Sequence, residues 1–146
     1  MADGNGERIR VILRTVQIHD DLEPGWDDEG EFRFRARVSS RNRGGISREL
    51  TLPGEDSHYN ASDHPARNRL YLNKVLFEGE VDDHLEVEID AEEVDWLTAN
   101  DQLGRYHRVW TGSPSSWIGF YHPGDEGSTD PERMGKWGIT LEIEKG

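Results

Sequence analysis

The sequence predicts an all-β fold: an antiparallel, eight-stranded β-sandwich formed by a single domain over residues 1–146, with residues 1–7 as a flexible lead. Short runs of β-branched and aromatic residues are separated by clusters of Gly, Pro, Asp and Asn, which is typical of such folds. One run alternates strictly between apolar and polar residues, as in a strand with one buried and one solvent-exposed face. The length favours one domain.

The strands can be placed in order along the chain. Residues 9–18 form a long run rich in β-branched residues, which predicts the first strand. In residues 31–38, Phe32 and Phe34 point to one side, whereas Arg33, Arg35 and Arg37 point to the other. Further strands are expected at residues 50–52, 70–77, 85–89, 103–110, 117–121 and 137–143. Three long connections remain, residues 19–30, 53–68 and 122–136, and long connections in compact domains are often functional.

Composition excludes several classes of function. The chain has 30 acidic and 17 basic side chains, a net charge of −13, and no cysteine. Disulfides, zinc–thiolate sites and a cysteine nucleophile are therefore excluded, and binding to nucleic acid through net charge is disfavoured. No apolar run approaches the roughly 20 residues of a membrane span, and residues 1–10 lack the apolar core of a signal peptide. We expect a cytoplasmic location, with peripheral attachment to a membrane as an option.

The charge is unevenly distributed. Residues 78–101 contain eleven acidic residues and no Lys or Arg, whereas residues 33–48 contain six arginines. Acidic residues also concentrate in residues 19–30 and 92–104, which follow predicted strands. Calcium takes about six to eight oxygen ligands in flexible geometry, and loops rich in carboxylates can supply them. The pattern therefore predicts a cation site formed by loops.

These acidic loops resemble those of C2-type domains, the calcium- and lipid-binding sandwiches of protein kinase C and synaptotagmins. Glu93, Asp95 and Asp101 have the spacing of the family's third calcium loop, and Gln102-Leu103-Gly104 follow as in its motif. Asp21 and Asp27 are six positions apart before a strand, as in the first calcium loop. The resemblance implies a C2-like fold with calcium as ligand, bound by Asp21, Asp27, Glu93, Asp95 and Asp101.

The resemblance also implies contacts with a membrane or partner. Trp26, Trp96 and Leu97 would enter a membrane surface once calcium has cancelled the loop charge, and the Arg33, Arg35 and Arg37 stripe would contact anionic lipid head groups. Other interpretations stay open. The tryptophans can pack on their own loops, the arginines can pair with Glu and Asp of neighbouring strands, and the second acidic loop can form a surface helix capped by Asp90.

No nucleophile elbow or phosphate-binding glycine loop is present, so we expect no enzyme. The first hypothesis is a calcium-binding C2-like module that docks to an anionic membrane surface or a protein partner when calcium is bound. The second is a structural or adaptor sandwich that needs no metal. The third is a carbohydrate-binding module that would use the C-terminal aromatic residues Trp110, Trp117, Tyr121 and Trp137, although their alternation with other strand residues favours packing in the core.

Overall fold

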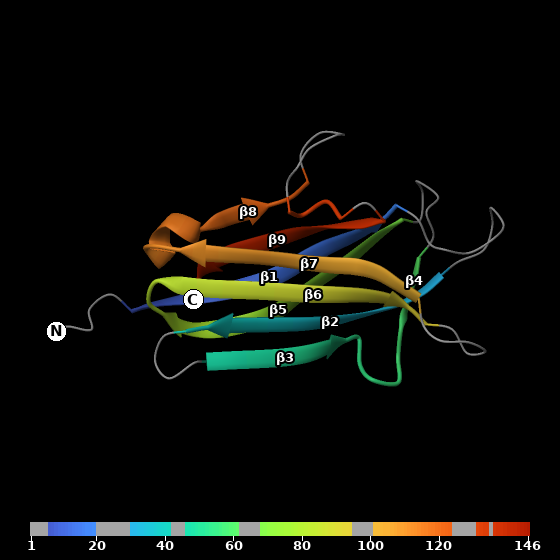
Figure 1. The fold of residues 1–146 in the computed structure, drawn as a ribbon, viewed down its shortest axis with the longest axis horizontal. Helices are drawn as coiled ribbons and strands as arrows, with labels where there is room; N and C mark the ends of the chain where they lie inside the picture. Colours follow the sequence, from blue (N-terminus) through green and yellow to red (C-terminus); the bar gives the residue numbers. More distant parts are fainter. Residues whose placement is uncertain are drawn as a thin grey trace.

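The computed structural model describes residues 6–19, 30–41, 46–61, 68–94, 101–123, 131–134 and 136–146. These residues form two antiparallel sheets that pack face to face around one apolar core, so the predicted β-sandwich is confirmed (Figure 1). In the ranges just given, no helix has the length and apolar character needed to cross a membrane.

The first sheet has four strands in the order β5-β1-β9-β8. Their bounds are Arg69–Val81 for β5, Glu7–Ile18 for β1, Trp137–Lys145 for β9 and Gly119–Tyr121 for β8. A 3-10 turn, η1 (Pro114–Trp117), precedes β8. Glu7, which we expected to belong to a flexible lead, is already the first residue of β1.

The second sheet has five strands: β3-β2-β6-β7 in order, with β4 paired to the beginning of β2. Their bounds are Ile46–Leu52 for β3, Gly30–Ser40 for β2, His84–Glu93 for β6, Asp101–Thr111 for β7 and Tyr59–Ala61 for β4. The described residues thus contain nine strands, one more than the eight expected. The additional strand is β4, a three-residue strand within the predicted connection 53–68, and its Tyr59 ring packs 6.0 Å from that of Phe34.

The core lies between the sheets and follows the alternation of the strands. On β2, Phe32 and Phe34 are fully buried, and the Phe34 ring lies 5.6 Å from that of Trp137 on β9. On β1, the inward-facing positions change parity between Leu13 and Val16, because the register with both neighbouring strands shifts there. This β-bulge keeps apolar residues in the core on both of its sides.

β6 continues to Glu93, which contradicts a helix capped by Asp90. Asp90 pairs with Arg35 of β2 on one side and with Arg105 of β7 on the other. A central strand with two hydrogen-bonded neighbours outweighs the local capping signal, because both ladders would be lost in a helix.

Candidate functional site

The two acidic segments of the sequence leave the sandwich from neighbouring strand ends. β2 begins, β6 ends and β7 begins at one edge, because Phe32 pairs with Glu93 and Glu93 pairs with Asp101. The backbone N–H of Val94 also donates to the carbonyl oxygen of Glu31 over 2.6 Å, which ties the end of β6 to the start of β2. The start of β2, where the first acidic segment ends, and the end of β6, where the second begins, are therefore hydrogen-bonded neighbours.

The predicted calcium ligands are described only in part. Glu93 is the last residue of β6, and only 4% of its surface is exposed. Asp101 is the first residue of β7, and its backbone lies opposite Glu93, while its side chain is outside the described atoms. The other predicted ligands and the predicted membrane contacts in the loops lie outside the described residues: Asp21, Asp27, Asp95, Trp26, Trp96 and Leu97.

A β-bulge in β7 sets this register. The pairing between β6 and β7 shifts after Ala91, which leaves Leu103 as an extra residue on β7. The adjacent Gly104 has a φ of 115°, a conformation that glycine adopts without the steric cost of a Cβ atom. Without the extra residue, Asp101 would not lie opposite Glu93.

The chemistry of the predicted ligands suits calcium. All five are carboxylates, and calcium prefers several carboxylate oxygens supplied by segments that can bend toward one point. Glu93 places its carboxylate at the end of the core, where a charge costs free energy unless it is paired. A calcium ion there would be held by Glu93 with the carboxylates of the two acidic segments, and it would add to the stabilisation of the buried charge.

The arginines of β2 form a stripe on the outer face of the five-stranded sheet. They alternate with the buried apolar residues of the strand, as predicted. Each has a carboxylate partner: Arg33 with Glu92 at 2.8 Å, Arg35 with Glu55 at 3.1 Å and Arg37 with Glu88 at 2.8 Å. Anionic lipid head groups would have to compete with these carboxylates, so the geometry favours pairing within the sheet over lipid contact.

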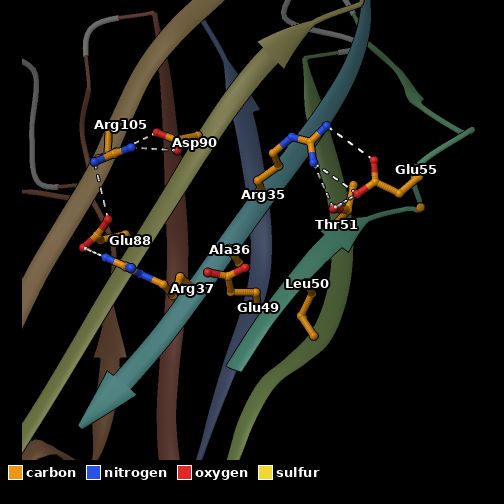
Figure 2. A pocket seen from close by; sticks show the side chains of 11 residues that line it. Arg35, Ala36, Arg37, Glu49, Leu50, Thr51, Glu55, Glu88, Asp90 and Arg105 are labelled. Carbon is orange, nitrogen blue, oxygen red and sulfur yellow. Dashed lines mark hydrogen bonds and ion pairs between the residues drawn. The ribbon is translucent and has the colours of Figure 1, made fainter. Parts of the chain in front are cut away.

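The ion pairs continue across β6 to β7. Figure 2 shows Arg105 between Asp90 and Glu88, at 2.7 Å and 3.4 Å. The bond to Asp90 raises the pKa of Arg105 above its usual range. Farther along, the His107 ring lies 2.6 Å from Glu86, and this hydrogen bond holds the pKa of the Glu86 carboxyl below its usual range. Opposite charges thus alternate across three neighbouring strands, which stabilises their register.

One group on this face has the composition of a metal site. Ligand atoms of Glu86, Glu88 and His107 lie within 4.8 Å of one another. However, Glu88 is already bonded to Arg37 and lies 3.4 Å from Arg105. Two guanidinium groups beside the carboxylate repel a metal cation, so this group serves the ion-pair ladder.

An open hollow of about 730 Å³ lies over the same face (Figure 2). Its charged lining carries both signs, from Arg35, Arg37, Arg105, Glu49, Glu55, Glu88 and Asp90. The hydrogen bonds of Glu55 with Thr51 and Arg35 hold its carboxyl pKa below the usual range, so it stays ionised. Mixed charge of this kind suits a protein surface of mixed charge better than a uniformly anionic membrane.

The C-terminal aromatic residues pack inward. Trp110, Trp117 and Trp137 are 6%, 2% and 0% exposed, and Tyr121 is partly buried with its ring 5.2 Å from that of Trp110. A sugar ring would need an exposed aromatic face to stack on, so the carbohydrate platform predicted from these residues is wrong. Trp110 and Trp137 occupy buried positions on β7 and β9, and Trp117 is buried in η1, so these side chains pack in the core, as their alternation favoured.

A buried polar network was not foreseen from the sequence. Glu132, which is 2% exposed, accepts hydrogen bonds from the Tyr106 hydroxyl at 2.9 Å and from Arg108 at 2.7 Å. The Arg108 guanidinium also lies over the ring of Tyr121, 4.5 Å from its centroid. Burial raises the pKa of Tyr106 above its usual range, so its hydroxyl remains a donor. The network fixes residues 131–134 against β7.

Comparison with known proteins gives a distant structural similarity and no match in sequence. No protein-family model and no curated protein matches the sequence. Among solved structures, the chain is similar to the C2A domain of plant Extended Synaptotagmin 1, with 10% sequence identity and a TM-score of 0.47. The match covers 94% of this chain and 92% of that chain. A similarity at this level says nothing about calcium, lipid or protein ligands.

Proposed function

We propose that this chain is a non-enzymatic, C2-like module that binds calcium and thereby docks to an anionic membrane surface or to a protein partner. The proposed calcium ligands are Asp21, Asp27, Glu93, Asp95 and Asp101. The proposed docking residues are Trp26, Trp96 and Leu97, which belong to the same two acidic segments.

One observation carries this proposal: the register that places Asp101 opposite Glu93 and Glu93 opposite Phe32. The segments that hold the other ligands begin or end within a few residues of these positions. The two acidic segments thus adjoin strand ends that are hydrogen-bonded neighbours, and this nearness supports the proposal of a shared ion.

Calcium would act as an electrostatic switch in this scheme. Without the ion, a cluster of carboxylates is repelled by an anionic surface. With the ion bound, the repulsion falls, and tryptophan side chains favour the membrane interface because they combine an apolar ring with a polar N–H group. The Arg33, Arg35 and Arg37 stripe has a secondary role, because each guanidinium already has a carboxylate partner.

A metal-independent adaptor is the second candidate, and the hollow of mixed charge on the outer sheet face favours it. A protein partner with complementary charges could bind there by replacing or extending the existing ion pairs. In that case the complex would persist in a calcium chelator.

Thermal unfolding in calcium and in chelator tests the first proposal. A ligand that binds only the folded state at 100 times its dissociation constant adds about 2.7 kcal/mol of stability, and for a chain of this size this is an increase of about 5–11 °C in melting temperature. Asp95→Asn and Asp101→Asn should abolish most of the increase. Asp83→Asn, in the turn at the other end of β6, should keep it.

Tryptophan fluorescence separates the possible partners. A calcium titration is run with no vesicles, with neutral phosphatidylcholine vesicles and with vesicles that also contain phosphatidylserine. A further change that requires phosphatidylserine supports membrane docking, and calcium-dependent capture of a protein without vesicle binding supports a protein partner. Identical melting temperatures in millimolar calcium and in chelator would contradict the calcium proposal.

A further inference from the structure

A second hollow, of about 280 Å³, lies on the outer face of the four-stranded sheet. It is built by register: Gln17 of β1 pairs with Arg69 of β5 and with Gly138 of β9, and Thr15 pairs with Thr140. Residues from the connection after β8 complete it, and the lining is Thr15, Gln17, Arg69, His122, Pro123, Arg133, Gly138, Ile139 and Thr140. Among the described residues, no carboxylate belongs to this lining.

The arginines of this hollow differ from those elsewhere on the sheets. Arg10, Arg14 and the arginines of β2 each have a carboxylate partner. Within the part of the chain that the structure describes, neither Arg69 nor Arg133 forms an ion pair, and Arg69 donates only to the side-chain oxygen of Gln17 at 3.2 Å. Two guanidinium groups with no carboxylate partner among the described residues of an acidic protein point to an anionic ligand.

Gly138 lines the hollow and allows its neighbours to pack closely against the backbone. A Cβ atom on Gly138 would lie 3.2 Å from the carbonyl oxygen of Glu132, 3.3 Å from Nε2 of His19 and 3.3 Å from Pro123. A larger residue would require these neighbours to move. Nε2 of His19 is buried and has no hydrogen-bond partner among the described residues. An unused polar atom therefore lies next to Gly138, which itself lines the hollow.

The donors present match a phosphate group. Guanidinium groups bind phosphate oxygens through paired N–H donors, and the hydroxyls of Thr15 and Thr140 with the amide of Gln17 can donate to further oxygens. The volume is close to the lower limit of about 300 Å³ for ligand pockets, which suits a phosphate on a small organic group. The net charge of −13 does not exclude an anion here, because exposed charges farther away than the Debye length of about 8 Å at physiological ionic strength are largely screened.

We propose that this hollow binds a phosphate monoester, held by Arg69 and Arg133 and oriented by Thr15, Gln17 and Thr140. The phosphate can belong to a lipid head group or to a free small molecule. The site lies on the other sheet from the arginine stripe, and it is independent of the calcium proposal because none of its lining residues is a proposed calcium ligand.

The test uses the full chain in chelator, so that calcium plays no part. Inorganic phosphate is titrated while amide chemical shifts are followed by NMR, and shifts should occur at Thr15, Gln17 and Thr140. Arg69→Gln or Arg133→Gln should weaken binding about tenfold or more, because each removes a charge-assisted contact. Arg35→Gln, a matched change on the other sheet, should leave the affinity within about twofold.

A second arm identifies the source of the phosphate. Phosphatidylcholine vesicles with and without phosphatidylinositol 4-phosphate are compared in a flotation assay. Binding that requires this lipid and is lost in Arg69→Gln supports a lipid head group, whereas phosphate binding without flotation supports a free phosphorylated molecule. The proposal is overturned if phosphate shifts none of these amides, or if Arg35→Gln weakens binding as much as Arg69→Gln and Arg133→Gln do. Thr140→Val, which keeps the charge and the shape, should weaken binding if the site is built as described.

Discussion

Replacing Glu132 with alanine is expected to destabilise the fold more than the loss of any exposed carboxylate. The Glu132 carboxylate is 2% exposed and accepts hydrogen bonds from Tyr106 and Arg108 through the same oxygen atom, at 2.9 Å and 2.7 Å. Alanine would leave the Tyr106 hydroxyl, which belongs to a fully buried residue, without its acceptor. It would also leave the Arg108 guanidinium without its counter-charge.

The expected loss of stability follows from these exposures. Removing one partner of a buried ion pair costs about 3–5 kcal/mol. The Arg108 side chain is 29% exposed and keeps part of its hydration, so we expect the lower end, about 3 kcal/mol. For a chain of this size that corresponds to a fall of about 6–12 °C in melting temperature. Glu132→Gln keeps an acceptor for Tyr106 and should cost less.

Urea unfolding followed by tryptophan fluorescence measures the change, because Trp110 lies beside the network, 5.2 Å from the Arg108 guanidinium. Glu55→Ala is the matched control, since Glu55 also forms an ion pair with an arginine but is 67% exposed. The reasoning is refuted if Glu132→Ala shifts the unfolding midpoint no more than Glu55→Ala does, or if Glu132→Gln costs as much as Glu132→Ala.

Two further predictions concern the second sheet. Arg33→Gln should lower the free energy of unfolding in urea by about 1.5–3 kcal/mol, because the Arg33 and Glu92 side chains are 15% and 12% exposed, whereas Arg35→Gln, at an exposed pair, should have a smaller effect. Burial and the charge of Arg41 hold the pKa of His84 below its usual value near 6.5 in the folded state. The resulting stability should be complete above pH 6.5 and should fall as the pH drops below it, because the unfolded chain then binds the proton first. Urea midpoints from pH 7.5 to 5.5 measure this fall, which should be shallower in His84→Asn.

The alternation of apolar and polar residues predicted the regular strands. It could not predict features that depend on the pairing of one strand with another. β2 alternates without interruption, so its buried and exposed faces were predictable from residues 31–38. In β1 the bulge near Arg14 changes the parity of the buried positions, and only the register with β5 and β9 reveals it. β4 has three residues, too few to show a period, and it forms because it pairs with the start of β2.

The candidate sites were predictable to different degrees. The acidic loops follow from local spacing, and the register adds that their strand ends are neighbours. The hollow with Arg69 and Arg133 has no local signal, because its residues come from three strands and a connection that are far apart in the sequence. The hydrogen bonds of Glu132 also could not be predicted, because Glu132 lies 24 residues from Arg108 in the sequence.

The pairing of the acidic residues narrows where a cation can bind. Of the eleven carboxylates in residues 78–101, five have Arg or His partners on the sheets: Glu78, Glu86, Glu88, Asp90 and Glu92. Glu80, Asp82 and Asp83 lie around the turn at the other end of β6. Glu93, Asp95 and Asp101 match the spacing of a calcium loop, and they belong to the segment where β6 ends and β7 begins. The five ion pairs stabilise the register of the outer sheet faces, and we predict that a response to calcium arises where β6 ends and β7 begins.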